Sequence, residues 1–459
     1  MSEAGISSEP PAKRALVFRL PGKESADNAH ILMRALEKVG IPGELCPYWP
    51  DGEASWETET VLLEREIGSA PRLTAVEFQQ RFGFELDLVE LSLHQFATEP
   101  LTPELLLPES KWRQHLRGVA VLAAERMKAS GADVVFVAHG AETVSRIIAE
   151  MAAHLGLRFL YWESGFFPGY VYVDPWAPHF FRGECWIDSQ PLPDEPSPEA
   201  LAFLETWRKD RLSKYAQTNK GLPPEVATWA AQDDRPILFL PGQVPTDANV
   251  VVNLGDHDSL TSLYANIIAH IPANWRVLYK SHPKSPTDPL EQALPSNDQF
   301  ICADIDIHDA FEISSAVLTV SSNVGLESIM AGKSTIIIGK PIYYGRKLST
   351  DIESPAELPK TLNSTLYKAS PKSTSCLVSL LIDKSLISAL NPTNIIDALS
   401  LQESAHSRQR ARFYEKVLMS KKLKARRTMF SLPTSHFFKI ESIRKIVRKI
   451  SVNLPSGRR

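Results

Sequence analysis

Residues 316–339 read AVLTVSSNVGLESIMAGKSTIIIG, and this stretch decides the fold class. Its first five residues form an apolar, strand-like run that leads directly into Ser321-Ser322-Asn323, three residues that favour helix N-caps. A short helix is expected over residues 324–331, Gly332 closes it, and a second apolar run follows. A strand, a capped helix and another strand in this order are the repeating unit of an open α/β fold with a parallel sheet.

The N-terminus of that helix is a candidate anion site. It presents N–H groups and a partial positive charge at the carboxyl edge of the sheet, where open α/β proteins bind phosphates. We therefore expect Ser321, Ser322 and Asn323 to bind the phosphate of a nucleotide. Glu327, one turn further on, is placed to accept from ribose hydroxyls. The alternative is an ordinary capped turn that binds no ligand.

Apolar strand-like runs alternate with helix-like periods along the chain, and they fall into two series. The strands of the first series are expected at residues 15–20, 133–138 and 158–162, and those of the second at 236–241, 275–280, 299–302, 316–320 and 335–338. A break rich in proline and acidic residues separates the two series at residues 187–200. The chain is therefore expected to form two successive open α/β domains.

We expect an N-terminal Rossmann-like domain over residues 1–225 and a C-terminal, nucleotide-binding Rossmann-like domain over residues 235–395. A closing helix over residues 396–420 and a basic amphipathic tail over 421–459 complete the chain. Two Rossmann-like domains that face a cleft describe the GT-B type of α/β architecture. Fold alone does not give function, so the function must be argued from the site.

The composition is that of a soluble globular protein, with 43% hydrophobic and 23% charged residues in a chain of 459. The N-terminus has no apolar signal core, and no run reaches the roughly 18–20 apolar residues of a membrane span, so we expect a cytoplasmic protein. The four cysteines have no paired spacing. This excludes a zinc ribbon or a disulfide framework and is typical of a reducing compartment.

The formal net charge of −4 hides an asymmetry between the tail and the rest of the chain. Residues 421–459 hold twelve Lys or Arg and one acid, Glu441, which gives +11 and leaves −15 for the rest. Apolar residues recur at helical spacing between the cations of residues 437–450, as in a helix that lies peripherally on an anionic membrane surface. A solvated basic tail or a partner-docking segment is the alternative. Nucleic-acid binding is not expected, because the core is acidic and holds no recognised module.

Two segments of the second domain place polar groups at the ends of predicted strands. Residues 280–284 read Lys-Ser-His-Pro-Lys, in which Pro283 biases His282 toward an extended backbone and the lysines Lys280 and Lys284 suit an anionic ligand. The alternative is a solvated basic loop. The loop after the first strand of the second domain contains Gln243 and Asp247, an amide and a carboxylate that can contact a sugar. An aspartate in such a loop is otherwise usually a turn former.

A third segment, residues 161–170, ends a strand of the first domain and reads YWESGFFPGY. Its position predicts that Glu163 also faces the cleft. The aromatic residues around it are more often core or loop packing than a substrate platform. A carboxylate beside so much apolar surface is a candidate for a raised pKa.

Two other patterns imitate known motifs and are set aside. Gly332-Lys333-Ser334 resembles the end of a phosphate-binding P-loop, but six residues separate Gly325 from Gly332 where the motif has four. The segment also follows a helix instead of preceding one. Asp304-Ile305-Asp306 resembles a metal-binding Asp-x-Asp, but one of the two aspartates is expected to cap the helix that starts near His308. No metal site is predicted.

Taken together, these segments resemble the capsule polysaccharide biosynthesis family, which includes bacterial β-Kdo transferases that use CMP-Kdo. The family's ordered motifs are Glu-x-Gly, Gln-x-x-x-Asp, Lys-x-His-Pro and Ser-Ser/Thr-x-x-Gly-x-Glu, the last ahead of a Gly-Lys. The matching residues here are Glu163 to Gly165, Gln243 to Asp247, Lys280 to Pro283 and Ser321 to Glu327. The later Tyr343-Tyr344 region, after Gly339-Lys340, also looks similar. The resemblance covers roughly residues 130–350.

This sequence departs from the family pattern at two places. Phe167 stands where the family usually has an arginine before Pro168, and His139-Gly140 replaces an Asn-Gly. An arginine at position 167 would suit a sugar carboxylate, so its replacement bears on the identity of the sugar.

The resemblance implies a glycosyltransferase that moves Kdo or a related acidic sugar from a CMP-activated donor to a surface-polysaccharide or lipid-linked saccharide acceptor, with retention. Asp247 would be the nucleophile and Glu163 the acid/base for the acceptor hydroxyl, two carboxyl groups that this chemistry places about 5–5.5 Å apart. His282 and the lysines would stabilise the leaving phosphate without a metal cofactor. Gln243 and Gly165 would lie toward the sugar or the acceptor.

Two other function classes stay open at this point. One is another enzyme of GT-B type: an inverting glycosyltransferase, a sugar-nucleotide epimerase or a polyol-phosphate transferase. These share the phosphate site but have no need for the Gln243 to Asp247 loop. The other is a non-catalytic polysaccharide-assembly protein that kept the fold.

Overall fold

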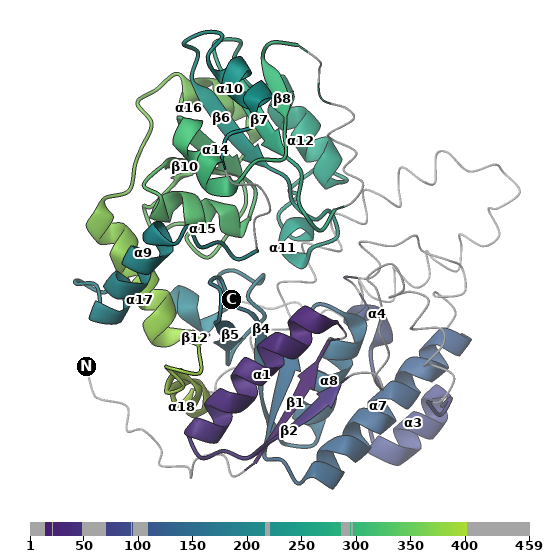
Figure 1. The fold of residues 1–459 in the computed structure, drawn as a ribbon. Helices are drawn as coiled ribbons and strands as arrows, with labels where there is room; N and C mark the ends of the chain where they lie inside the picture. The colour runs from purple at the N-terminus through teal and green to yellow at the C-terminus, as the bar shows by residue number, and fades with distance from the viewer. Residues whose placement is uncertain are drawn as a thin grey trace, which may run out of the picture.

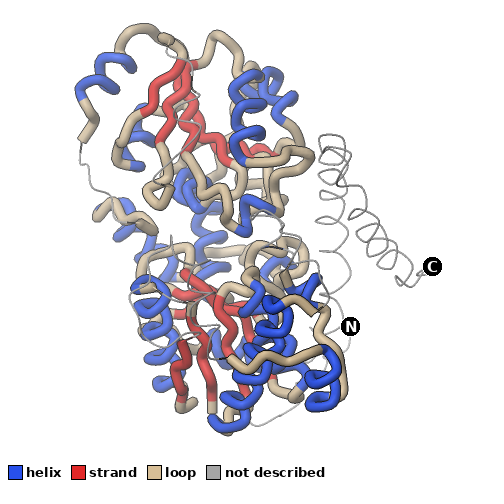
Figure 2. The backbone as a smooth tube through the Cα atoms, turned by 90° about the vertical axis from the view of Figure 1, so that its right-hand side faces the viewer, coloured by secondary structure: helices blue, strands red, loops and turns tan. Residues whose placement is uncertain are grey.

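The computed structural model describes residues 14–20, 22–47, 70–92, 94, 109–215, 221–285, 294 and 297–401. These residues form two lobes, each built on a six-stranded sheet flanked by helices (Figure 1; Figure 2). The α/β fold with two Rossmann-like domains is thereby confirmed. No helix in the described part of the chain combines the length and the apolar character that crossing a bilayer needs.

The first sheet has the strand order β12-β5-β4-β3-β1-β2. Its strands are β1 (Ala15–Arg19), β2 (Gly43–Pro47), β3 (Val134–Ala138), β4 (Arg158–Ser164), β5 (Val171–Asp174) and β12 (Leu386–Ile387). The four strands β1 to β4 pair in parallel, and β5 and β12 add to the β4 edge as antiparallel strands. The parallel strands are apolar on both faces, as expected for a sheet that is covered on both sides.

Helices cover each face of this sheet. The helices α1 (Lys23–Lys38) and α18 (Asn394–Ser400) pack on one face, and α3 (Ala75–Phe82), α7 (Lys111–Ser130) and α8 (Thr143–His154) pack on the other. The short helix α4 (Leu88–Leu91) lies beside α8. Alternate residues of β1 belong to opposite cores: Leu16 packs with α7 and α8, while Val17 packs with α1.

The second sheet is entirely parallel, with the order β11-β10-β9-β6-β7-β8. Its strands are β6 (Ile237–Pro241), β7 (Arg276–Lys280), β8 (Phe300–Cys302), β9 (Ala316–Thr319), β10 (Ser334–Ile337) and β11 (Thr350–Asp351). Numbered by chain order within the sheet this is 3-2-1-4-5-6, the doubly wound dinucleotide-binding order. The order reverses between β6 and β9, and such a switch point is where open α/β sheets bind their ligands.

The helices of the second lobe also form two layers. The helices α12 (Leu260–Ala269) and α16 (Leu358–Leu362) pack on one face, and α10 (Pro224–Ala230) and α14 (Ile307–Ile313) pack on the other. The helices α11 (Ala248–Val251) and α15 (Asn323–Met330) lie at the end of the sheet that faces the first lobe (Figure 1). Short 3₁₀ turns occur at Trp186–Ser189 and Pro355–Glu357.

The two lobes are joined by a pair of packed helices, α9 (Pro198–Lys209) and α17 (Pro371–Lys384) (Figure 1). After α17 the chain returns to the first lobe, where β12 pairs with β5 and α18 covers the sheet. The second domain was predicted to end at residue 395, whereas the chain rejoins the first lobe at β12. A strand of two residues leaves no recognisable pattern in the sequence. The predicted closing helix over 396–420 overlaps α18 at its start; its remainder and the tail over 421–459 lie outside the described residues.

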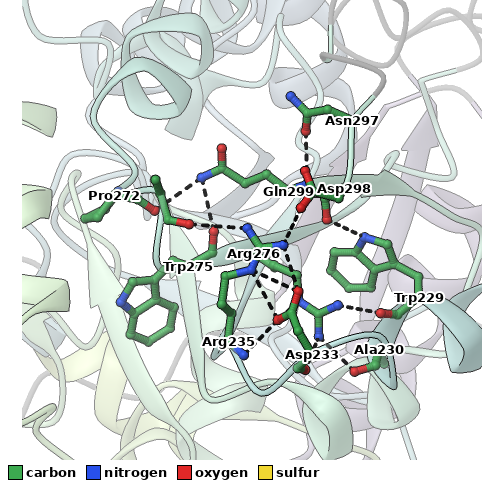
Figure 3. Close-up of polar contacts among 11 residues, drawn as sticks. Trp229, Ala230, Asp233, Arg235, Pro272, Trp275, Arg276, Asn297, Asp298 and Gln299 are labelled. Carbon is green, nitrogen blue, oxygen red and sulfur yellow. Dashed lines mark hydrogen bonds and ion pairs between the residues drawn. The ribbon is translucent and has the colours of Figure 1, made fainter.

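The amino edge of the second sheet is closed by a polar network around Arg276 (Figure 3). The Arg276 side chain is 1% exposed, donates to the carbonyl oxygens of Trp229, Ala230 (2.8 Å) and Asp233 (3.1 Å), and lies 4.5 Å from the centre of the Trp229 ring. The bonds to Trp229 and Ala230 satisfy the last two carbonyls of α10, which have no partner within the helix. The opposite, carboxyl edge is the one at which open α/β sheets bind ligands.

Candidate functional site

A pocket lies between the two lobes, where β6 and β9 end at the switch point of the second sheet. It encloses about 720 Å³, open solvent included. The second lobe contributes Gln243, Asp247, Asn249, His282, Ser321, Ser322, Asn323 and Tyr343, and the first lobe contributes Phe166, His179 and Arg182. The segment that links α9 to α10 adds Lys214 and Tyr215. The pocket thus combines a helix N-terminus with charged and hydrogen-bonding groups from both lobes.

The N-terminus of α15 opens onto this pocket, as the sequence predicts. The Ser322 hydroxyl caps the helix by accepting from Val324 N at 3.1 Å. The Ser321 hydroxyl donates to Asn249 O at 3.1 Å. The Asn323 amide donates to Phe166 O at 3.1 Å and so ties the helix to the other lobe. No packed side chain fills the helix end, since all three residues line the pocket.

Two contacts hold this helix end in place. The Gln243 amide oxygen accepts from Thr319 Oγ1 (3.1 Å), Val320 N (3.2 Å) and Ser321 N (3.3 Å), so it fixes the end of β9 to the end of β6. Gln243 lines the pocket, but its amide oxygen is occupied inside the protein, and the predicted sugar contact stays a prediction.

The second contact is a close approach at Gly325. A Cβ on this residue would lie 1.8 Å from Tyr343 Oη, which donates to Ser322 O at 2.9 Å. Only glycine leaves room for this ring, and the ring in turn holds the capping residue.

His282 presents an N–H donor to the pocket. Its Nδ1 accepts from Lys284 N at 3.1 Å, so the proton of the neutral ring lies on Nε2. Burial, followed by the charges of Lys284 and other nearby lysines, lowers the pKa of His282 to about 4. The ring is therefore neutral at pH 7 and suits hydrogen bonding to an anion without adding charge.

The two predicted nucleotide-binding lysines lie elsewhere. Lys280 pairs with Asp304 at 2.7 Å, and Lys284 contacts Glu24 of α1 and lies 4.5 Å from the centre of the Tyr215 ring. Neither lines the pocket. Both lysines were predicted to contact the nucleotide, but each pairs with an acidic residue outside the pocket. The pattern at a strand end does not reveal which acidic residue a lysine pairs with.

The lysine that lines the pocket is Lys214. Burial lowers the pKa of this ammonium, while the charges of Glu163 and Asp247 oppose the shift. The residue lies in the linking segment, outside every motif, so nothing in the sequence singled it out.

Two side chains lie between Glu163 of the first lobe and Asp247 of the second lobe and connect them across the interface. The Nδ1 atom of His179 contacts Glu163 Oε1, and its Nε2 atom lies 2.7 Å from Asn249 Nδ2. Asn249 also donates to Asp247 Oδ1, from its side chain at 3.1 Å and from its backbone at 2.8 Å. The two carboxylates are thus linked by His179 and Asn249.

Asp247 also has a structural role. It is the N-cap of α11, and it is exposed at the pocket. The turn-forming alternative considered for this residue is therefore part of its role, and the same carboxylate is available to a ligand. Gly165 lies in the turn from β4 to β5 and does not line the pocket; a Cβ there would lie 2.5 Å from Tyr170 O, so its position is explained by packing.

A second histidine, His139, lies close to these groups. Its backbone is left-handed (φ 57°), and its Nδ1 lies 2.9 Å from Glu142 Oε1. Burial disfavours the imidazolium, but the adjacent Glu142 carboxylate outweighs this and raises the pKa of His139 to about 10. His139 does not line the pocket, and it adds a fixed positive charge behind it.

Glu327 lies away from the pocket, 3% exposed, which differs from the predicted contact with a ribose. Its carboxylate accepts from Lys214 N (3.0 Å) and from the side chains of Ser213 (3.4 Å) and Asn323 (3.3 Å). It therefore fixes the linking segment to α15. Burial raises the pKa of Glu327 to about 7, although these hydrogen bonds oppose the shift.

Asp304 and Asp306, the two acids of the Asp-x-Asp pattern, have separate partners. Asp306 is the N-cap of α14, which confirms the predicted cap, and it pairs with Arg211 at 3.1 Å. Among the described residues, no group of three or more His, Cys, Asp or Glu side chains is arranged to hold a metal ion.

The fold and the pocket define a protein of GT-B type, with its candidate site at the carboxyl edge of the second sheet. Residues 195–376 match the family model described as capsule polysaccharide biosynthesis protein. The family predicted from the ordered motifs is thereby confirmed for this segment, which contains three of the four motifs. The Glu163 motif lies before it.

Curated relatives match parts of the chain. Protein FixF of Sinorhizobium fredii is 24% identical over 214 residues, which cover 46% of this chain and 49% of FixF. The capsule polysaccharide modification protein LipA of Neisseria meningitidis serogroup A is 24% identical over 181 residues, 37% of this chain and 24% of LipA. The chain spans about half the length of the first relative and about a quarter of the second.

Solved structures of similar shape include a β-Kdo 2,4 transferase, KpsC of Thermosulfurimonas dismutans, at 19% identity and a TM-score of 0.41, covering 54% of this chain and 79% of that one. The β-Kdo 2,7 transferase of the same KpsC has 18% identity and a TM-score of 0.38, covering 68% and 97%.

The raised pKa of Glu327 predicts a pH-dependent stability. Between about pH 4.5 and pH 7 the folded protein keeps a proton that the unfolded chain has lost, so the free energy of unfolding falls as the pH rises and levels off above pH 7. Glu327→Gln keeps an oxygen acceptor for Lys214 N but cannot titrate. Urea unfolding at pH 5 and pH 8 should therefore show the wild type losing about 2–3 kcal/mol relative to this variant. The same pH dependence in both proteins would contradict the assignment.

Proposed function

We propose that the protein is a glycosyltransferase that moves Kdo or a related acidic sugar from a CMP-activated donor to a surface-polysaccharide or glycolipid acceptor, with retention of configuration. The observation that supports this most directly is the pocket itself. It sets the exposed carboxylate of Asp247 beside the N-terminus of α15 and includes His179 of the opposite lobe. Glu163 does not line the pocket but contacts His179.

The phosphate of the donor would dock at the end of α15. The hydroxyls of Ser321 and Ser322, the Nε2–H of His282 and the ammonium of Lys214 all line one pocket. Ser322, His282 and Lys214 offer hydrogen bonds and one positive charge to a single leaving phosphate, while the Ser321 hydroxyl already donates its proton to Asn249 O. We expect these groups to stabilise the departing nucleotide without a divalent cation.

Retention requires two displacements. In the first, a carboxylate oxygen of Asp247 attacks the anomeric carbon, the bond to the phosphate oxygen breaks, and CMP leaves with the bonding electrons. In the second, the acceptor hydroxyl attacks the same carbon, the bond to Asp247 breaks, and the hydroxyl proton passes to the Glu163 side of the pocket. Each inversion reverses the other, so the sugar keeps its configuration.

The relatives support the class of acceptor. The matched family is described as acting in capsule polysaccharide biosynthesis, and LipA is described as modifying capsule polysaccharide. We extend the same class of acceptor, a surface polysaccharide or its lipid-linked precursor, to this protein. The reaction would take place in the cytoplasm, at the inner face of the membrane.

The mechanism makes Asp247 indispensable. Asp247→Ala and Asp247→Asn should each lower CMP release from CMP-Kdo by roughly 10³-fold or more while leaving the affinity for CMP nearly unchanged. Asparagine can still cap α11, so Asp247→Asn should retain stability, whereas the alanine variant should lose about 1 kcal/mol. The rate of CMP release is measured with and without EDTA. Calorimetric titration measures the affinity for CMP, and thermal melts measure the stability of each variant.

The outcomes separate the competing functions. Full activity of Asp247→Asn removes this residue from the mechanism. A product of inverted configuration points to an inverting enzyme of GT-B type. A wild-type protein that binds CMP but turns over no CMP-sugar points to a non-catalytic role in polysaccharide assembly.

The basic tail provides a second test of the proposal. We expect residues 421–459 to hold the enzyme on anionic membrane surfaces, near a lipid-linked acceptor. The full chain should co-sediment with phosphatidylglycerol vesicles at low salt and dissociate as salt is raised, and a chain ending at Met419 should stay in the supernatant. Equal sedimentation of the two chains would contradict a membrane role for the tail.

A further inference from the structure

Glu327 is a buried carboxyl group that the proposed chemistry does not use. The sequence predicted that it contacts a ribose, yet the residue is 3% exposed and lies outside the pocket. Its Oε1 atom accepts from Lys214 N, from the Ser213 hydroxyl and from the Asn323 side-chain amide. Two of these partners, Lys214 and Asn323, line the pocket. Glu327 therefore contacts residues that surround a ligand, without lining the pocket itself.

The linking segment that carries Lys214 is held at three points. Arg211 pairs with three acids of α14 and its N-cap, and the His308 side chain of α14 donates from Nε2 to Leu212 O at 2.9 Å. The third point is Glu327 on α15, and it is the one that bonds the Lys214 backbone, at 3.0 Å. We therefore expect the place of the Lys214 ammonium in the pocket to depend on Glu327.

The bonds to Glu327 Oε1 can persist when the carboxyl group is protonated. A proton on Oε2 leaves Oε1 as an acceptor, so Lys214 N and the other donors keep their partner. Loss of the oxygen itself is different, because an N–H inside a protein is unfavourable when it has no acceptor. The position of the linking segment thus requires the oxygen of Glu327 and is compatible with either protonation state.

The charges near Glu327 come from several elements. Burial raises the pKa of Glu327 to about 7, and the hydrogen bonds and the Lys214 ammonium oppose this shift. The Tyr215 hydroxyl of the linking segment also lies in the field of Glu327. On α9, Arg208 donates to Met330 O at the C-terminus of α15 at 3.4 Å. The α14 side contributes the ion pairs and the histidine described above. The strands β9 and β10 beside α15 contain no charged residue, and α17 packs on α15 through apolar side chains.

A phosphate at the end of α15 would change the balance at Glu327. It would add a second negative charge near the carboxylate and would attract the Lys214 ammonium to itself. Both effects disfavour the charged form of a buried carboxyl group. The neutral form still accepts from Lys214 N, so the linking segment can stay in place while the carboxylate takes a proton from solvent.

We propose that Glu327 is a positioning residue for the nucleotide: it holds Lys214 in the pocket, and its carboxylate takes up a proton from solvent when the phosphate binds. This rests on the proposed function for the presence of a nucleotide in the pocket, and it adds a proton to the binding step. Sugar transfer is not needed to observe it, so the binding of CMP alone tests it.

The first measurement is the affinity for CMP at pH 7, by calorimetry, in the wild type, Glu327→Gln and Glu327→Leu. Glutamine keeps an oxygen for Lys214 N, so this variant should bind CMP within about twofold of the wild type. Leucine has a similar size but no acceptor, so it should weaken binding roughly tenfold. Thermal melts identify a variant that fails to fold, and if the leucine variant does, the glutamine variant still decides.

The pH profile of binding distinguishes proton uptake from a purely structural role. Above the pKa of Glu327 in the free protein, a proton must be taken up with each CMP, so the affinity falls as the pH rises. The affinity of the wild type should fall roughly fivefold between pH 7 and pH 8.5, and that of Glu327→Gln should stay nearly constant. The charge of CMP is constant over this range, because its second phosphate pKa is about 6.

Calorimetry in two buffers counts the proton directly. In Hepes and in Tris at pH 7.5, the heats of binding differ by the number of protons taken up multiplied by the difference in buffer ionisation heat. The wild type should take up roughly half a proton per CMP, and Glu327→Gln close to none. Lys214 and His282 are present in both proteins, so their titration affects both measurements equally.

Glu312→Gln is the matched control. Glu312 also anchors the linking segment, through Arg211 at 2.9 Å, but its side chain is 69% exposed and lies outside the pocket. This variant should match the wild type in both affinity and pH profile. Loss of the pH dependence here as well would assign it to the linking segment as a whole and contradict a specific role of Glu327.

The remaining outcomes are distinct. A Glu327→Gln variant with the pH profile of the wild type overturns the proton uptake. A folded Glu327→Leu variant with wild-type affinity overturns the positioning role. Both results leave the transferase proposal standing, whereas a wild type that binds no CMP at any pH overturns the proposed nucleotide site and the function built on it.

Discussion

The site depends on how the end of β9 is held against the end of β6. The Gln243 amide oxygen accepts from Thr319, Val320 and Ser321, and this fixes the point at which the chain leaves the sheet and begins α15. Tyr343 holds the capping residue from the other side, in space that only Gly325 leaves free. Because these contacts orient the helix end before any ligand arrives, the Ser322 hydroxyl and the partial positive charge of the helix end are already in place for the anion that the proposed function requires.

The chemistry depends equally on the opposite lobe. Neither lobe contains the whole site: the exposed carboxylate and the helix end belong to the second lobe, and Glu163 with His179 belongs to the first. The contact between His179 and Asn249, together with the bond from Asn323 to Phe166 O, crosses the interface at the pocket. The contact between the lobes thereby joins the two carboxylates in one connected network.

The sequence was most informative where a local pattern determines the structure. The apolar run and the caps at Ser321 to Asn323 predicted β9 and α15 almost to the residue, because strand hydrophobicity and N-cap chemistry are local. It was least informative where distant segments meet. The strands β5 and β12 pair across more than two hundred residues, and Lys214 and His179 enter the pocket from loops without a motif. The roles of Glu327 and Lys280 depend on tertiary partners that no spacing reveals.

A crystal structure of the protein with CMP would decide whether the end of α15 is the phosphate site. The phosphate should lie at the N-terminus of α15, within hydrogen-bonding distance of the Ser321 and Ser322 side chains and His282 Nε2, with its free oxygen directed toward Asp247. A nucleotide bound with its phosphate away from this helix end, or bound outside the pocket between the lobes, would exclude this site.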